Sequence, residues 1–134
     1  MGMRDDIDTL INYRTWAVAG ASNNPDKVGF DIFVTMRDAG YLVFPINPRE
    51  PEIAGTKAYA SVADLPVAPD VVDLVVPPGA TLGVVKAAIE RGTKGVWFQP
   101  GSESEEAVGE ALRAGLIVVA GGPCAMTHRR RWVS

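Results

Sequence analysis

Short apolar stretches alternate with amphipathic ones along the chain, a pattern typical of strands that alternate with helices. The apolar stretches predict strands at residues 16–19, 41–46, 71–76, 95–98 and 116–120. The amphipathic stretches predict helices over residues 4–12, 29–39 and 81–91, and a further helix that opens near Ser102 and Ser104 and ends at Gly115. The less regular stretch between them predicts a short edge strand at 57–60 and one helical turn at 61–64.

This alternation predicts the fold class. Strands separated by helices of this length imply right-handed crossovers and a parallel sheet. The strand at 71–76 is apolar on both faces apart from Asp73, as a strand buried on both sides requires. We therefore predict an α/β fold in three layers, with a mostly parallel twisted sheet and helices on both faces. Because no repeat or low-complexity linker interrupts the 134 residues, we expect residues 1–134 to form a single domain.

The loop after the first predicted strand has the features of a phosphate site. It runs from Gly20 to Gly29, where a helix begins. Backbone N–H groups converge at such a helix N-terminus, and the helix dipole adds about half a positive charge. The loop is not the dinucleotide fingerprint, because Ser22 and Pro25 stand where glycines would be needed, and it is not a P-loop. Ser22 and Lys27 still offer a hydroxyl and a positive charge, so we expect a nucleotide-like ligand.

Proline and glycine also recur after the other predicted strands, at residues 47–50, 77–79, 99–102 and 121–124. Any one of these loops is explained by the turn that it must make. Ligands of parallel sheets bind at the carboxyl ends of the strands, and all five loops lie there. Together they favour a shaped groove along that edge of the sheet.

Composition and charge narrow the class of partner. The net charge is −3, which gives no electrostatic reason to expect nucleic acid as a partner. No apolar run approaches the roughly 20 residues that cross a bilayer, and acidic residues stand where a signal peptide would be apolar. Cys124 is the only cysteine, so no internal disulfide is possible. We expect a cytoplasmic protein that binds neither nucleic acid nor membrane.

Candidate catalytic residues are few. His128 lies in a basic terminal segment and is typical of a surface residue, and Cys124 is a candidate nucleophile, redox partner or inert buried thiol. The acids that follow Ser102 complement a helix dipole, and Asp73 suits a buried, hydrogen-bonded role better than catalysis. No metal-ligand spacing is present. We therefore expect no catalytic residue and no metal.

The loop at 47–50 bears on the choice of nucleotide. An NAD site uses a carboxylate at the end of the second strand to bind the ribose hydroxyls. Here Asn47 is neutral, and the first acid, Glu50, lies four residues beyond the strand. Arg49 is a candidate partner for a phosphate on the ribose, which favours coenzyme A or NADP. Alternatively, Arg49 and Glu50 form a solvated turn.

Taken together, these motifs resemble the small stand-alone CoA-binding proteins, which are single Rossmann-like domains similar to the CoA-binding domain of the succinyl-CoA synthetase α subunit. The resemblance covers residues 12–131. It rests on residues 18–22 with 27–29, 45–48, Gly55, Tyr59 with Ser61 and Val62, 73–77, 97–101, and 124–126 with His128.

The resemblance implies that coenzyme A lies along the carboxyl ends of the strands. The loop that would hold the pyrophosphate consists of Gly20, Ala21, Ser22, Lys27, Val28 and Gly29. The other implied contacts are Asn47 and Pro48 near the adenosine, Val76, Pro77 and Pro78 as a second wall, Gln99, Pro100 and Gly101 beside the pantetheine, and Cys124 toward the thiol. A mixed disulfide between Cys124 and the ligand thiol is a further hypothesis. We also expect Gly20→Val to block the ligand while leaving most of the fold intact.

The expected function is binding of coenzyme A or an acyl-CoA without catalysis, by a monomer or weak homo-oligomer. One alternative is an NAD(P)-binding oxidoreductase or redox sensor, which would need the glycine fingerprint and the acid that are missing here. Another is a subunit-like component of an ADP-forming acyl-CoA synthetase assembly. The resemblance does not extend to ligase activity, because the phosphorylated histidine of those enzymes belongs to a second domain, and His128 lies in the wrong segment.

Overall fold

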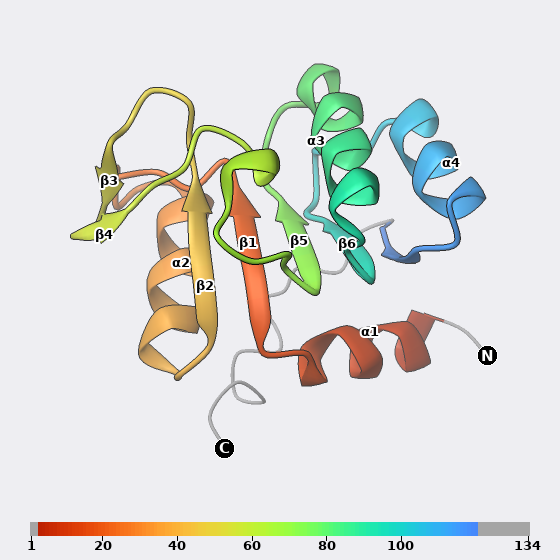
Figure 1. Cartoon of the computed structure of the whole chain (residues 1–134), viewed down its shortest axis with the longest axis horizontal. Coiled ribbons are helices and arrows are strands. Elements are labelled where there is room, and N and C mark those ends of the chain that lie inside the picture. Colours follow the sequence, from red (N-terminus) through yellow and green to blue (C-terminus); the bar gives the residue numbers. More distant parts are fainter. Residues whose placement is uncertain (1–2, 121–134) are drawn as a thin grey trace.

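The computed structural model describes residues 3–120, and its centre is a five-stranded parallel sheet in the order β2-β1-β5-β6-β7 (Figure 1). The strands are β1 (Thr15–Ala19), β2 (Leu42–Ile46), β5 (Val71–Leu74), β6 (Gly95–Phe98) and β7 (Ile117–Val119). The helices are α1 (Met3–Asn12), α2 (Val28–Asp38), α3 (Pro78–Arg91) and α4 (Glu105–Arg113), with one 3₁₀ turn, η1 (Val62–Asp64). The predicted α/β class is confirmed.

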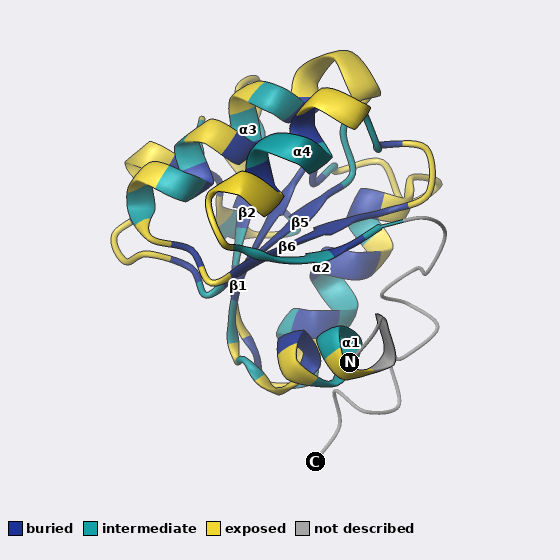
Figure 2. Cartoon of the chain, turned by 90° about the vertical axis from the view of Figure 1, so that its right-hand side faces the viewer, coloured by how far each residue is buried: buried dark blue, intermediate teal, exposed yellow. Residues whose placement is uncertain are grey.

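Helices cover both faces of the sheet: α1 and α2 lie on one side, and α3 and α4 on the other (Figure 2). Alternate residues of each strand enter the two resulting cores, because successive side chains of a strand point to opposite faces. In β5, Val71 packs with the core under α2, whereas Val72 and Leu74 pack with the core under α3 and α4. The sheet is therefore buried on both faces, which explains its nearly continuous apolar strands.

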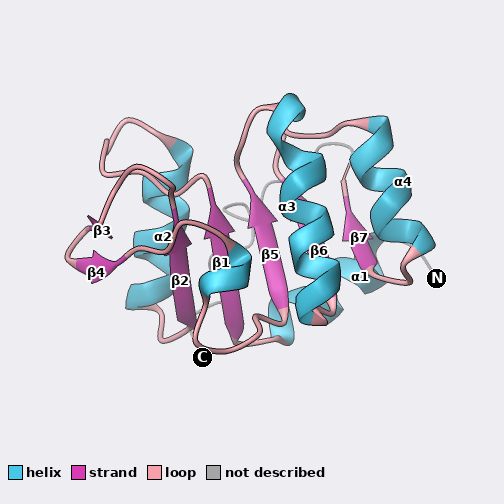
Figure 3. Ribbon diagram, turned by 45° about the horizontal axis from the view of Figure 1, so that its top comes forward, coloured by secondary structure: helices cyan, strands magenta, loops and turns pink. Residues whose placement is uncertain are grey.

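The order of the strands creates a switch point between β1 and β5. The chain leaves β1 toward α2 on one face and joins β2, and it leaves β5 toward α3 on the opposite face (Figure 3). Two loops thus diverge from neighbouring strand ends, and a crevice forms between them. The backbone holds this region firmly: Gly20 N–H donates to the Ile46 carbonyl at 3.1 Å, and Val75 N–H donates to the Ala19 carbonyl at 2.9 Å.

Two predicted boundaries at the switch point are wrong. The strand expected at 71–76 ends at Leu74, so Val75 and Val76 belong to the loop. The helix expected from Thr81 begins at Pro78, because proline's fixed φ suits the first helical turn and its missing N–H needs no partner there. The segment read as a loop, 77–79, is therefore mostly the start of α3. The loop between β5 and α3 is therefore short, and α3 begins close to the carboxyl ends of the strands.

The edge strand expected at 57–60 is also wrong. Its first residue belongs instead to a separate hairpin of β3 (Glu52–Ile53) and β4 (Thr56–Lys57). Tyr59 makes only an isolated parallel bridge beside β2, in which its N–H donates to the Pro45 carbonyl at 3.0 Å and its carbonyl accepts from Asn47 N–H at 2.9 Å. The predicted helical turn at 61–64 is confirmed as η1. Of the two serines before α4, Ser104 is the N-cap and accepts from Ala107 N–H at 3.1 Å.

The turn of the hairpin contains a strained alanine. Ala54 has φ 48° and Gly55 has φ 81°, the paired positive values of a two-residue hairpin turn. We expect Ala54→Gly to raise the free energy of unfolding by about 0.5–1 kcal/mol, because glycine adopts positive φ without steric penalty. Urea unfolding measures this. The control is Ala114→Gly at φ −81°, which should give no gain; equal gains at both positions would contradict the explanation.

Candidate functional site

A groove of about 730 Å³ lies at the carboxyl ends of β1, β5 and β6. We call it the first groove; it is lined by Gly20, Ala21, Ser22, Lys27, Val28, Gly29, Asn47, Arg49, Val75, Val76, Pro77, Gln99 and Pro100. A second groove of about 580 Å³ adjoins it over the face of α3. It is lined by Ala19, Gly20, Ile46, Asn47, Pro48, Arg49, Ala60, Ser61, Val62, Val76, Pro77, Ala80, Gly83, Val84 and Ala87. The two share Gly20, Asn47, Arg49, Val76 and Pro77, so they form one continuous depression.

The structure brings most of the predicted site residues to these grooves. All six residues predicted in the first loop line the first groove, together with Asn47, Val76, Pro77, Gln99 and Pro100. Pro48 lines the second groove, and Gly101 lines a small cleft that shares Lys27 and Pro100 with the first groove. Pro78, the first residue of α3, lines none of these hollows. Cys124 lies outside the described residues. Which of these residues contact a ligand stays a prediction.

Sequence reasoning missed the wall that α3 contributes. Ala80, Gly83, Val84 and Ala87 form one face of this helix and line the second groove. Their spacing of three and four residues, which places them on one face of a helix, was the signal in the sequence from which this wall could have been predicted. Small residues at that spacing leave room above the helix, and the apolar lining makes the second groove suited to a flat, largely apolar group.

Close packing between two glycines shapes the first loop. A Cβ at Gly29 would lie 2.2 Å from the Gly20 carbonyl oxygen, so the first turn of α2 rests directly on the loop backbone. Gly20 has φ +96°, and a Cβ there would lie 2.8 Å from the Val75 carbonyl oxygen. The expectation that Gly20→Val leaves the fold intact is therefore wrong, since valine would be strained in that conformation and would collide with the loop after β5.

The N-terminus of α2 opens onto this groove without a side-chain cap. Lys27 is the N-cap, in an extended conformation, and no side-chain hydrogen bond caps the helix there. The first N–H groups of a helix have no partner within the helix. At α2 they belong to Val28 and Gly29, which both line the first groove. This arrangement suits an anion, which accepts those hydrogen bonds and interacts favourably with the helix dipole.

Charge in the first groove has one sign. Lys27 and Arg49 are both exposed and line it, and none of the described residues that line it is acidic. Arg49 also lines the second groove, so this residue lies where the two meet. The groove therefore favours a polyanion, although the whole chain carries a net charge of −3.

Two asparagines tie the first loop to the segment after β2. Asn47 donates from Nδ2 to the Ala21 carbonyl at 2.9 Å and accepts Arg49 N–H on Oδ1 at 2.8 Å. Asn23 donates to the Glu52 carbonyl at 2.8 Å and accepts Ala54 N–H at 2.9 Å. Asn47, expected beside the adenosine, thus holds the loop in place with its side chain. Sequence reasoning did not find this role, because the partners are 26 and 31 residues away from these asparagines.

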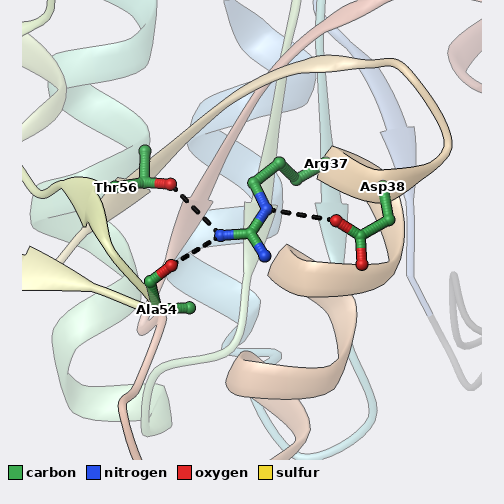
Figure 4. Close-up of polar contacts among 4 residues, drawn as sticks. All are labelled: Arg37, Asp38, Ala54 and Thr56. Carbon is green, nitrogen blue, oxygen red and sulfur yellow. Dashed lines mark hydrogen bonds and ion pairs between the residues drawn. The ribbon is translucent and has the colours of Figure 1, made fainter.

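Arg37 adds a tie between α2 and the hairpin (Figure 4). Its Nη1 donates to the Ala54 carbonyl at 2.7 Å and to Thr56 Oγ1 at 3.2 Å, while Nε pairs with Asp38 at 3.3 Å. Together with Asn23, this arginine connects α2, the first loop and the hairpin. Hydrogen bonds therefore hold the first loop, which lines the first groove, in place before any ligand binds.

Asp73 lies behind the first groove. It is fully buried, and its Oδ1 accepts a hydrogen bond from Gln99 Nε2 at 2.5 Å, which confirms the predicted buried, hydrogen-bonded role. Burial raises the pKa of the Asp73 carboxyl from 3.8 to about 7, and the hydrogen bond from Gln99 opposes part of that rise. The other oxygen, Oδ2, has no hydrogen-bond partner within residues 3–120.

Within residues 3–120, no three His, Cys, Asp or Glu side chains cluster closely enough to hold a metal ion. None of the helices in the same range has the length and apolar character needed to cross a membrane. The chemistry that the described site offers is therefore that of hydrogen bonding, positive charge and apolar contact.

Comparison with known proteins agrees with this geometry. Residues 14–129 match the family model of the CoA binding domain. The chain belongs to the CoA binding domain family. The matched range begins just before β1 and contains every residue of both grooves, so the family resemblance expected from the sequence is confirmed.

Relatives of this CoA binding domain include both short chains and parts of long ones. It is 40% identical over 91 residues to the Pyrococcus furiosus acetate–CoA ligase [ADP-forming] II subunit alpha, a match that covers 67% of this chain but 20% of that subunit. It is 31% identical to the uncharacterized protein YneT of Bacillus subtilis over 77% of this chain and 76% of that protein. A hypothetical protein from Pyrococcus horikoshii OT3 has a similar structure, with a TM-score of 0.90, 38% identity, and coverage of 98% of this chain and 92% of that one.

Proposed function

We propose that this CoA binding domain binds coenzyme A or an acyl-CoA in the two joined grooves, without catalysis of its own. The observation that carries the proposal is the union, at the switch point, of a cationic groove at an uncapped helix N-terminus with an apolar groove over α3. Coenzyme A combines a charged diphosphate, a flat adenine and an uncharged pantetheine arm, so it needs surfaces of both kinds. The family match supports the same ligand.

The lining residues suggest how the ligand would be distributed. The diphosphate would accept hydrogen bonds from the N–H groups of the first loop and of α2, near Lys27. The adenosine would lie in the second groove, between Pro48 and the small-residue face of α3. The pantetheine would pass Gln99 and Pro100 toward Gly101. In this arrangement Pro78 acts only indirectly, by starting α3 close to the strand ends.

Arg49 is the residue best placed to recognise the phosphate on the ribose, since it lines both grooves. We expect Arg49→Ala to weaken binding of coenzyme A about tenfold, the scale of one charge-assisted hydrogen bond, and to leave binding of 3′-dephospho-CoA unchanged. Calorimetric titration with both ligands measures this. Arg113→Ala, at an exposed arginine of α4, is the control. An equal loss for the two ligands would place Arg49 elsewhere on the ligand.

The proposal is tested by calorimetric titration of the reduced protein with coenzyme A, acetyl-CoA, NAD and NADP. We expect binding of coenzyme A or its acyl form and none of the nicotinamide nucleotides. Binding of NADP without coenzyme A would support the oxidoreductase alternative instead. If none of the four binds, the proposal is wrong for the isolated chain.

A second candidate is a component of an ADP-forming acyl-CoA synthetase assembly. It is favoured by the 40% identity to a subunit of an acetate–CoA ligase, of which this chain matches only 20%. In that case the chain would supply the coenzyme A site, and catalysis would come from a partner chain. Co-purification with a nucleotide-binding partner, and ligase activity of the pair alone, would support this role.

A further inference from the structure

The Asp73 carboxyl is separated from the ligand groove by one side chain. Asp73 lies between Val18 of β1 and Trp97 of β6 in the register of the sheet, and it is fully buried. Its Oδ1 accepts from Gln99 Nε2, while Oδ2 has no hydrogen-bond partner among the described residues. An acid in this apolar setting is unfavourable for stability, since burying a polar oxygen without a partner costs free energy. Packing alone does not explain its presence.

Gln99 lines the first groove, and its hydrogen bond to Asp73 adds to the bonds that hold this residue in place. Phe98 pairs with Leu74, so Gln99 lies one residue beyond the paired strands. Its N–H donates to the Leu74 carbonyl at 3.0 Å, and its carbonyl accepts from Ser102 Oγ at 2.8 Å. Those bonds hold only the backbone. The bond to Asp73 holds the side-chain amide of Gln99, a residue that is 2% exposed.

We propose that Asp73 is a positioning residue for the ligand: it fixes the side chain of Gln99, which forms part of the first groove. This inference rests on the proposed function and assigns Asp73 to the pantetheine side of the ligand. A wall that is held before binding spares the ligand the entropy of ordering it. Removing the acceptor on Asp73 should therefore weaken contacts to the pantetheine and leave contacts to the nucleotide unchanged.

Two ligands distinguish contacts to the pantetheine from contacts to the nucleotide. Coenzyme A spans the whole groove, whereas adenosine 3′,5′-bisphosphate lacks the pantetheine. Asp73→Leu keeps the number and branching of side-chain heavy atoms but removes the acceptor, and Asp73→Asn keeps an acceptor. In calorimetric titrations at one neutral pH, we expect Asp73→Leu to lose about tenfold in affinity for coenzyme A and none for the bisphosphate. Asp73→Asn should bind both ligands like the wild type, a rescue that a loss of shape would not give.

Thr93→Val is the matched control. Thr93 also has a buried oxygen without a hydrogen-bond partner in the described part of the chain, but it precedes β6 at the opposite end of that strand. This variant should bind both ligands normally. Asp73→Leu combined with Gln99→Met should be no weaker than Gln99→Met alone, because the two residues act through one contact.

The outcomes are distinct. Wild-type affinity of Asp73→Leu for coenzyme A, or an equal loss for both ligands, would overturn the positioning role. If that variant does not fold, the smaller Asp73→Ala decides: normal binding of coenzyme A, or an equal loss for both ligands, overturns the proposal, and a loss confined to coenzyme A supports it. If the wild type binds neither ligand, the proposed function fails, and this inference fails with it.

Discussion

Replacing Gly29 by alanine should lower the free energy of unfolding by about 3 kcal/mol and abolish measurable binding of coenzyme A. The added Cβ would lie 2.2 Å from the Gly20 carbonyl oxygen, which is backbone and cannot rotate away. Either α2 or the first loop must move. Alanine in a helix is otherwise favoured over glycine by about 0.5–1 kcal/mol, so the collision outweighs the gain in helix propensity.

Gly109→Ala is the control for this variant. Gly109 is also helical, but a Cβ there would meet only the end of the flexible Arg113 side chain, at 3.2 Å. We expect this control to be more stable than the wild type by about 0.5–1 kcal/mol and to bind coenzyme A normally. Urea unfolding and calorimetric titration of the two variants measure both effects. If Gly29→Ala gains stability like the control, the contact between the loop and α2 does not shape the site.

The second large effect concerns pH. The folded pKa of Asp73, about 7, lies above its ordinary value of 3.8, so between these values the folded protein holds a proton that the unfolded chain has released. Stability therefore falls as pH rises through this window. Three pH units correspond to at most about 4 kcal/mol. We expect the stability of wild type relative to Asp73→Asn to fall by up to this amount between about pH 4 and pH 8, because asparagine does not titrate in that range.

Denaturant unfolding of both proteins across this pH range measures the effect. Glu110→Gln provides a control of opposite sign. Arg113 lowers the pKa of the exposed Glu110 carboxyl by a hydrogen bond. Glu110 therefore stabilises the fold at pH values above the ordinary pKa of its carboxyl, and this contribution is lost as pH falls. Parallel pH profiles for wild type and Asp73→Asn would show that burial does not perturb Asp73.

Much of the architecture could be predicted because it depends on local patterns. The five strands of the sheet appear as short apolar runs, and the helices appear as stripes with a spacing of three and four residues. Strand periodicity is insensitive to where pairing stops, so the strand at 71–76 was predicted too long. The hairpin of β3 and β4 was missed because its strands have only two residues each, too few to show any period.

The candidate site could be predicted as far as the position of its loops. The rule that ligands bind at the carboxyl ends of parallel strands selected segments that the structure brings together around one depression. The roles of the individual residues within those segments were not predictable. Asn47 holds the loop, Pro78 starts a helix, and Gln99 is held from behind by Asp73. The roles of Asn47 and Gln99 depend on partners that are distant in sequence.

The sequence by itself determined the α/β class, the order of its main elements and the edge of the sheet at which a ligand would bind. These follow from periodicity and turn chemistry, which act between near neighbours in the chain. Only the tertiary structure decided that Gly29 must lack a side chain, that the small residues of α3 form a second groove, and that Asp73 is buried beside Gln99. These features arise from contacts between segments that meet only when the sheet assembles, and steric exclusion and desolvation act at those contacts.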